Sequence, residues 1–425
     1  MDEGHFAYIG DRHNWGSETP LCFAQKDRRN HLYVIGKTGV GKTTVLRNMI
    51  VQDIDAGLGV GVIDPHGDLA EELLSTIPPS RIEDTVYFNP ADKEFPIGLN
   101  VLHSFPKEHS HLAASGIVGA FKGIWADSWG PRLEYILYAT VAALVECENT
   151  TLLGVQRMLT DTWYRAWVIR QIKDPLVLNF WTREFKQYEG KFLTEAVSPI
   201  LNKVGQLFMV PQIRNVLGQV KSKIGARFIM DNRRIFIANL SKGRLGEDKS
   251  HLLGALLVNQ FQLAAMARAD TPEKDRKDFM LYVDEFQNFT SDSFAGILSE
   301  ARKYRLCLTL SHQFMTQLPE KTRDAVLGNV GAIVAFRVGS LDALVLEREF
   351  GASFPAARFT ELENHEVLVK MLSDGRYREP FRATTWPSLL VDYGKRETII
   401  RRSREKYGTP RRQIEERIRK WVESR

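Results

Sequence analysis

The sequence predicts an α/β protein with a mostly parallel central sheet and an inserted all-α domain. Short apolar runs rich in β-branched residues alternate with helical patterns along most of the chain. Several of these runs are almost continuously apolar, which is typical of strands that are covered on both faces. Residues 107–227 instead carry apolar residues at three- and four-residue spacing, which predicts helices only. With 425 residues, 44% of them hydrophobic, the chain is long enough to split beyond one core.

The elements are expected in the following order. The predicted strands are HLYVIG (31–36), LGVGVID (58–64), TVYFNP (85–90), RIFIANL (234–240), FMLYVDEF (279–286), LCLTLSHQ (306–313), AIVAFRVG (332–339) and EVLVKML (366–372). The predicted helices outside the insertion cover residues 43–56, 250–269, 292–303 and 341–350. Residues 1–106 and 228–393 therefore form the two parts of the sheet domain, with the helical domain at 107–227 between them and a helical tail at 394–425.

The net charge of +5 is concentrated in that tail. Residues 395–425 hold 12 Lys or Arg and five Asp or Glu, so the remainder of the chain is slightly acidic. A Thr-Pro helix start precedes Ile414, Ile418 and Trp421 on one predicted face. The tail predicts either contact with phosphate or another acidic partner, or simply a solvated helix face.

Targeting and redox features indicate a cytoplasmic protein. No apolar run reaches the ~18–20 residues that span a bilayer, and the first residues lack the pattern of a signal peptide. Cys22, Cys147 and Cys307 are far apart and match no zinc spacing or disulfide framework, so we expect reduced thiols.

The run GKTGVGKTT at 36–44 matches the phosphate-binding loop G-x-x-x-x-G-K-[ST]. Glycines allow backbone N–H groups to surround phosphate oxygens, and the helix that follows directs its positive end at the same anion. Lys42 is expected to reach the β- and γ-phosphates, and the Thr43 hydroxyl to ligate Mg²⁺. The residues expected to bind the nucleotide are Gly36, Thr38, Gly39, Val40, Gly41, Lys42, Thr43 and Thr44.

A second acidic site follows the strand at 279–283. Asp284 is expected to hold the Mg²⁺ shell, and Glu285 to polarise the attacking water. The alternative is that these two acids cap the next helix.

Two further side chains lie at predicted strand ends, where ligands bind in parallel sheets. Gln313 is expected to contact the γ-phosphate or its water, because an amide bonds to both; the alternative is an ordinary polar loop residue. Arg337 could reach the γ-phosphate of a neighbouring subunit, or form a local ion pair with Asp342 or Glu347. His312 is expected to be structural. Asp64, at the end of the strand in VIDPHGDL, either shapes the turn before a helix or lies near the nucleotide or a subunit interface.

Together the phosphate loop, VIDPHGDLAEELL, LYVDEFQNF, EARKYRLCLTLSHQ and GNVGAIVAFRVG resemble the FtsK–HerA superfamily in order and spacing. Within it, the chain is most similar to conjugative coupling proteins and related type IV secretion ATPases, and the ending SREKYGTPRRQIEERI resembles the same branch. The resemblance covers most of residues 6–410. Coupling proteins usually carry N-terminal membrane-spanning helices, and no such segment is seen here.

The resemblance implies a RecA-like, P-loop ATPase that forms a ring, usually a hexamer, and moves DNA with ATP and Mg²⁺. It implies that Lys42 and Thr43 are Walker A residues, that Asp284 and Glu285 are Walker B residues, that Gln313 is the sensor, and that Arg337 acts on a neighbour. It also implies sequence-independent contacts with the DNA phosphate backbone. Because the membrane-spanning helices of coupling proteins are not found here, three alternatives stay open: a soluble member, a protein that docks on a separate membrane-anchored secretion partner at the inner membrane, or a fragment.

Three functions follow as hypotheses. The first is an ATP-hydrolysing DNA translocase in conjugation or type IV secretion. The second is an ATPase that energises protein export or assembly of a secretion machine, with polypeptide in place of DNA. The third is a non-motor nucleotide switch or kinase.

Overall fold

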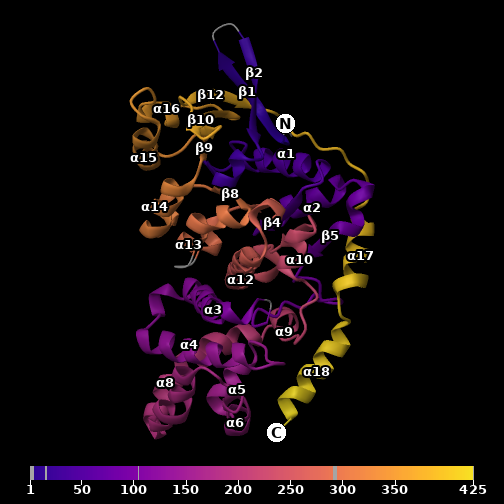
Figure 1. The fold of residues 1–425 in the computed structure, drawn as a ribbon, viewed down its shortest axis with the longest axis vertical. Helices are drawn as coiled ribbons and strands as arrows, with labels where there is room; N and C mark the ends of the chain where they lie inside the picture. The colour runs from indigo at the N-terminus through magenta and orange to yellow at the C-terminus, as the bar shows by residue number, and fades with distance from the viewer. Residues whose placement is uncertain (1–3, 15–16, 104, 291–293, 425) are drawn as a thin grey trace. The chain divides into compact units, whose positions relative to one another are not determined.

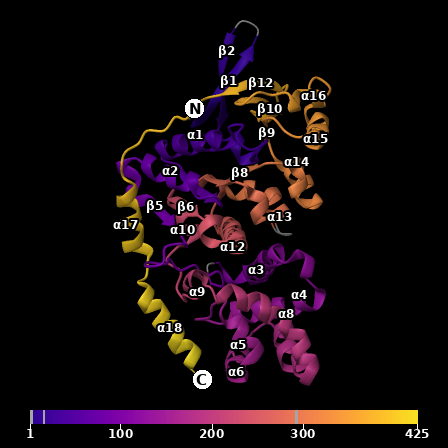
Figure 2. The same cartoon turned by 180° about the vertical axis from the view of Figure 1, so that it is seen from behind.

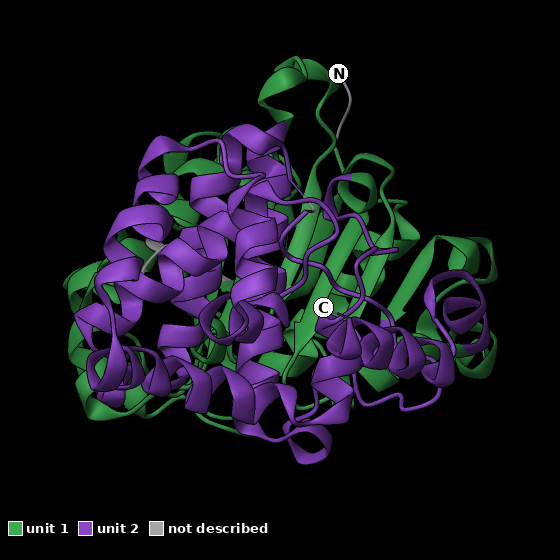
Figure 3. Cartoon of the chain, turned by 90° about the horizontal axis from the view of Figure 1, so that it is seen from below, with its two compact units in different colours: residues 1–87, 228–239, 268–400 green, residues 88–227, 240–267, 401–425 purple. Residues whose placement is uncertain are grey.

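The computed structural model describes residues 4–14, 17–103, 105–290 and 294–424 (Figure 1). The chain forms two compact units, each assembled from separate stretches of sequence and distinguished by colour in Figure 3. Unit 1 contains residues 1–87, 228–239 and 268–400, and unit 2 contains residues 88–227, 240–267 and 401–425. The four-part domain division drawn from the sequence stays a prediction.

Unit 1 is built on the sheet. Its strands are β1 (Phe6–Asn14), β2 (Ser17–Ala24), β3 (Leu32–Ile35), β4 (Gly59–Asp64), β5 (Thr85–Phe88, which crosses the unit boundary), β6 (Ile235–Asn239), β7 (Phe279–Val283), β8 (Leu306–His312), β9 (Ala332–Ala335), β10 (Glu366–Ser373), β11 (Arg376–Tyr377) and β12 (Phe381–Thr385). Their order is β2-β1-β12-β10-β9-β3-β8-β7-β4-β6-β5, and β11 pairs with β10.

The strands from β9 to β6 are parallel, and they form the centre of the sheet. This arrangement confirms the predicted α/β class, and every strand predicted from the sequence is present. Beyond β9 the sheet continues as an antiparallel flank of β10, β12, β1 and β2. Of the flank only β10 was predicted; β2, for example, is exposed over its first half and lacks the apolar run that marks the central strands.

Helices cover the sheet of unit 1. They are α1 (Lys42–Asp55), α2 (Asp68–Thr76), α10 (Ala226–Asp231), α13 (Phe294–Glu300), α14 (Glu320–Asn329), α15 (Ser340–Phe350) and α16 (Ala356–Thr360), and α17 (Arg396–Tyr407) crosses into unit 2 (Figures 1 and 2). Apolar residues of α1 and α2 pack with alternate residues of the strands in one cluster, including Val34, Val62 and Val334. The predicted helix at 292–303 appears as α13 followed by a 3₁₀ turn, and residues 292–293 lie outside the described residues.

Unit 2 is helical, which confirms the prediction for residues 107–227. Its helices are α3 (Ser110–Ile124), α4 (Pro131–Glu146), α5 (Gly154–Thr160), α6 (Thr162–Ile169), α7 (Pro175–Asn179), α8 (Gly190–Phe208), α9 (Pro211–Leu217), α11 (Lys242–Leu245), α12 (Glu247–Met266) and α18 (Arg411–Glu423). The long α12 packs against α3, so a helix that the sequence assigned to the sheet domain contributes to this unit.

The C-terminal helix α18 is docked within unit 2. Ile414 is buried, and the ring of Trp421 lies 5.8 Å from that of Tyr164 on α6. The Arg157 guanidinium donates to the Trp421 carbonyl over 2.7 Å. The predicted apolar face of the tail therefore serves packing, while Arg412 and Arg419 on other faces are exposed.

Two further expectations concern thiols and membranes. All three cysteines are free, and Cys147 and Cys307 are buried. Across the described ranges, we find no helix that combines the length and the apolar character required to cross a bilayer.

Candidate nucleotide site

The phosphate-binding loop joins β3 to α1 and is held by two neighbouring strand ends. The Gly36 amide donates to the His312 carbonyl, and the Lys37 amide donates to the Arg337 carbonyl over 2.9 Å. Gly41 caps α1 in a left-handed conformation with φ of 117°, which explains why glycine stands there. At Gly36, a Cβ atom would lie 2.5 Å from the Cβ of Phe336, so the loop fits closely against the sheet.

Lys42 is buried inside this loop. Its ammonium donates to the carbonyls of Gly36 and Lys37 over 2.7 and 2.9 Å. Burial lowers the pKa of Lys42, and the carboxylates of Glu285 and Asp284 oppose that shift. The cation and the two predicted acids therefore share one site. The hydroxyl-bearing Thr43 next to it is exposed at the start of α1.

Asp284 and Glu285 follow β7, beside the strand that leads into Gln313. Both are buried, at 5% and 7% exposure, so neither is a solvated surface acid. Glu285 has a left-handed backbone, with φ of 45° and ψ of 50°. Such a conformation is costly for a residue with a side chain, and it occurs most often at functional sites.

The carboxylate of Glu285 is held by two amides. The Gln313 side chain donates to Oε1 over 3.0 Å, and the Gln287 side chain donates to Oε2 over 2.7 Å. These bonds fix the orientation of the carboxylate while leaving lone pairs on both oxygens. The structure thus brings Lys42 together with Asp284, Glu285 and Gln313, which lie more than 200 residues later in the sequence.

Negative charge accumulates at the end of β7. Burial and the neighbouring carboxylates of Glu285 and Asp64 raise the pKa of Asp284 to about 6. A divalent cation would relieve this repulsion, so the donor set fits Mg²⁺ held by Asp284 and the Thr43 hydroxyl. No cluster of three or more His, Cys, Asp or Glu side chains suits a metal ion in the described ranges, so phosphate oxygens and water would complete the coordination.

Arg337 lies at the end of β9, next to its own phosphate loop. Its guanidinium donates to the Leu362 carbonyl over 3.2 Å and to Oδ1 of Asn364 over 3.1 Å. The ion pair with Asp342 or Glu347, weighed as an alternative, is not formed within the described part of the chain; Asp342 accepts from the Met315 amide. Both partners of Arg337 are neutral, so its positive charge is not neutralised by a carboxylate there.

Two other residues have structural contacts. Asp64 accepts from the amides of His66 and Ala70, over 2.8 and 2.9 Å, and so orders the turn that begins α2. His312 is fully buried; burial and the nearby Lys42 cation lower its pKa to about 3, and the Tyr33 hydroxyl lies 3.1 Å from its Nδ1. The contacts of His312 agree with its structural interpretation. Asp64 orders the turn and also lies close enough to Asp284 to raise its pKa, so both interpretations of Asp64 stay open.

Sequence reasoning missed two features near or beyond this site. Gln287 holds Glu285, and its signal was its position two residues after the acid. In unit 2, a pocket of about 440 Å³ is lined by Arg157, Trp163, Tyr164, Trp167, Arg170 and Trp421. Trp163 is 74% exposed and Trp167 41% exposed, which is unusual for tryptophan. The rings come from α6 and α18, so no local pattern marked them as a group.

Comparisons with known proteins bear on the family and the fold. Residues 9–118 match the family described as "Helicase HerA, central domain". The resemblance to the FtsK–HerA type of P-loop ATPases is confirmed. The matched residues include the phosphate loop and α1. A comparison with curated protein sequences found no match.

Solved structures share the fold. Plasmid coupling protein TrwB in complex with ADP and Mg²⁺ has a TM-score of 0.61 and 15% identity, over 87% of this chain and 88% of that chain. VirB4 of Thermoanaerobacter pseudethanolicus has a TM-score of 0.54 and 12% identity, over 92% and 98%. At these identities the likeness establishes the RecA-like fold.

Proposed function

We propose that this protein is an ATP hydrolase that works as a ring, most simply a hexamer, and couples ATP hydrolysis to DNA movement in conjugation or type IV secretion. The observation that carries the catalytic part is the convergence of Lys42, Asp284, Glu285 and Gln313 at one edge of the sheet.

The roles of the residues follow from their positions. The amides of residues 36–44 and the Lys42 ammonium bind the phosphates, and Thr43 and Asp284 hold Mg²⁺. The metal ion, when bound, neutralises charge on the phosphate oxygens. Glu285 accepts a proton from the attacking water, and the Gln313 amide, already bonded to Glu285, orients that water against the γ-phosphate.

The proposed assembly of subunits into a ring is based on Arg337. Its guanidinium has no carboxylate partner in the described residues and lies at the edge that carries the nucleotide loop. To reach a neighbour's γ-phosphate it must leave Leu362 and Asn364, which are neutral partners and cost less to release than an ion pair.

DNA as the cargo is supported by three observations. The HerA-type match and the coupling-protein fold both belong to this functional context. In addition, the pocket of unit 2 combines exposed tryptophan rings with arginines, the combination on which single-stranded bases stack while phosphates are neutralised. Secretion would bring the protein to a membrane-anchored partner at the inner membrane.

The decisive experiment compares ATP turnover of the wild type and Glu285→Gln, with and without DNA. We expect turnover to fall at least ~100-fold while ATP binding persists, because the amide cannot accept the proton. Glu300→Gln, an exposed change on α13, is the matched control. Unchanged turnover in Glu285→Gln would exclude its role as the base.

The same assay separates the three functions. DNA, added in separate assays as duplex and as single strands, should raise turnover several-fold at low salt in at least one form, and the effect should fade as salt rises. An ATPase for protein export would not respond to DNA. Full activity of a dilute monomer would favour the switch or kinase, and electron microscopy with ATP should show rings for the first two functions.

A further inference from the structure

A short loop, residues 361–365, lies at the same edge of unit 1 as the phosphate loop. It connects α16 to β10, which runs antiparallel to β9 with Leu368 opposite Ala335. The first residue of β10, Glu366, therefore lies beyond the carboxyl end of β9. That edge carries the nucleotide loop after β3 and Gln313 after β8.

This loop is connected to the phosphate loop once directly and once through Arg337. The His365 amide donates to the Val40 carbonyl over 3.0 Å. At the other end, Arg337 donates to Leu362 and Asn364 while its own carbonyl accepts from Lys37. Residues 361–365 are thus attached to both the beginning and the end of the loop that holds the phosphates.

His365 has a backbone φ in the left-handed region, as His31 also does elsewhere in the chain. Its φ is 68°, and its carbonyl accepts from the Thr385 amide over 2.8 Å and from the Thr385 hydroxyl over 3.2 Å. A Cβ placed on Gly41 would lie 2.9 Å from its Nδ1, so the imidazole lies directly beside the start of α1. The side chain is nevertheless exposed, so packing of the core does not account for its placement.

The order of the strands gives a direction to the bound nucleotide. Glu285 and Gln313, to which the proposed function assigns the γ-phosphate, follow β7 and β8 on one side of β3. The nucleoside is at the opposite end of the triphosphate. It must therefore leave the phosphate loop on the other side of β3, where β9, residues 361–365 and β10 lie.

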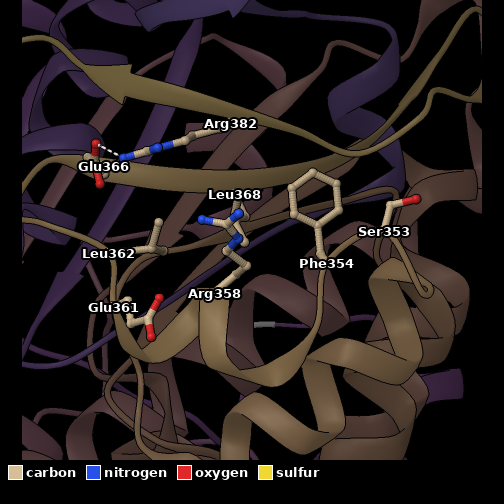
Figure 4. Close-up of a pocket in the computed structure, with 8 residues that line it drawn as sticks. All are labelled: Ser353, Phe354, Arg358, Glu361, Leu362, Glu366, Leu368 and Arg382. Atoms are coloured by element: carbon tan, nitrogen blue, oxygen red, sulfur yellow. Dashed lines mark hydrogen bonds and ion pairs between the residues drawn. The ribbon is translucent and has the colours of Figure 1, made fainter.

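A pocket of about 360 Å³ is found on that side of unit 1. Figure 4 shows its lining residues, which are Ser353, Phe354, Arg358, Glu361, Leu362, Glu366, Leu368 and Arg382. Arg382 is paired with Glu366. Arg358 and Glu361 are exposed and form no ion pair within the described ranges. The pocket offers an aromatic ring, two leucines, a guanidinium and a carboxylate, which suit a flat base that carries an amino group.

We propose that this pocket and residues 361–365 bind the nucleoside of the nucleotide whose phosphates lie in the 36–44 loop. The base packs against Phe354 and Leu368 and its amino group donates to Glu361, while the ribose lies beside His365. This assignment rests on the proposed ATP binding, and it adds the part of the site that recognises the base.

The test compares ATP with inorganic tripolyphosphate, which has the phosphates but no nucleoside. Isothermal titration with Mg²⁺ measures both affinities for the wild type, Phe354→Ala and His365→Asn; asparagine tolerates the left-handed backbone. We expect the wild type to bind ATP more tightly than tripolyphosphate. Each variant should lose about tenfold in ATP affinity and keep its affinity for tripolyphosphate.

Tyr377→Ala, which removes an aromatic ring that is 60% exposed elsewhere in the flank, is the matched control and should change neither affinity. If the ratio of the two affinities stays the same in both variants, the nucleoside assignment is wrong while ATP binding stands. If the wild type binds ATP and tripolyphosphate with equal affinity, the nucleoside assignment is likewise wrong. If the wild type binds neither ligand, both the assignment and the proposed function fail.

Discussion

Two buried carboxylates of unit 1, Asp53 and Asp284, lie in opposite electrostatic environments. Asp53, on α1, accepts two bonds from Arg28 over 2.7 and 2.8 Å and a third from the Tyr282 hydroxyl over 2.5 Å, and His5 lies 3.1 Å away. Burial would raise the pKa of Asp53, but Arg28 and its other partners outweigh burial and lower it.

The pKa of Asp284 is shifted in the opposite direction. It is almost equally buried, yet its neighbours include Glu285 and Asp64, so its pKa rises to about 6. The comparison separates a structural charge, which the protein neutralises itself, from a functional charge that is left for a cation. Each prediction below tests this distinction.

The largest effect is expected for Asp53→Asn. Removing the carboxylate leaves Arg28 buried without its partner, which should lower the free energy of unfolding by ~3–5 kcal/mol. Urea unfolding measures this value, with Asp55→Asn, an exposed change on the same helix, as the control. A loss below ~1 kcal/mol would show that the Asp53 network is dispensable.

Asp284→Asn should stabilise the protein, whereas Asp53→Asn should destabilise it. The measurement is made in EDTA and without nucleotide. The variant removes the charge of Asp284 from beside Glu285 and Asp64, so we expect the free energy of unfolding to rise by ~1–3 kcal/mol. ATP turnover should be lost in the same variant. Destabilisation comparable to that of Asp53→Asn would contradict the distinction between the two carboxylates.

Buried histidines extend the comparison to pH. Burial lowers the pKa of His31 to about 4 and that of His312 to about 3, below the usual value near ~6.5. The unfolded chain therefore gains protons first, so stability present above pH ~6.5 is lost as the pH falls toward 4, by up to ~1.4 kcal/mol per pH unit for each group.

Unfolding is measured from pH 7 to 4.5 in the wild type and in His312→Gln. The raised pKa of Asp284 contributes in the opposite direction in both proteins, so the difference between them isolates the imidazole, and His312→Gln should lose less stability than the wild type as the pH falls. His111→Gln, an exposed change, should leave the slope as it is. An equal slope in wild type and His312→Gln would mean that this imidazole does not resist protonation.

The smallest effect on stability is expected for Trp163→Ala. The ring of Trp163 is 74% exposed and contributes little to packing, so the change should lower the free energy of unfolding by less than ~0.5 kcal/mol. Trp181 is 1% exposed, and its indole N–H donates to the Ala139 carbonyl. The same change there should lower the free energy of unfolding by ~3–5 kcal/mol. Single-stranded DNA binding by Trp163→Ala, followed by fluorescence anisotropy, should still weaken several-fold. Undiminished binding would remove this pocket from the DNA surface.

Much of the catalytic edge could be predicted from local patterns. The glycine-rich run placed Lys42 and Thr43, and an apolar strand that ends in two acids placed Asp284 and Glu285. The same rule of strand ends pointed to Gln313. The hydrogen bond between Gln313 and Glu285 could not be predicted from the sequence, because it depends on β7 and β8 being neighbours in the sheet.

Features built from distant segments were not predictable. His365 carries no motif; its contact with Val40 exists because β10 pairs with β9 in one register. The tryptophans of α6 and α18 are separated by more than 250 residues, and only the docking of α18 brings Trp421 to Tyr164. Likewise, the sequence places α12 in the sheet domain, but in the structure this helix packs with α3.

The sequence alone determined that this protein has a phosphate loop, a pair of acids at a strand end, a parallel sheet and a helical insertion, since each of these is written in residue types at short spacing. The tertiary structure alone decided which strand ends adjoin, how Glu285 is held, and where the antiparallel flank places His365. Those properties depend on pairing and packing between residues far apart in the chain, and local periodicity contains no information about them.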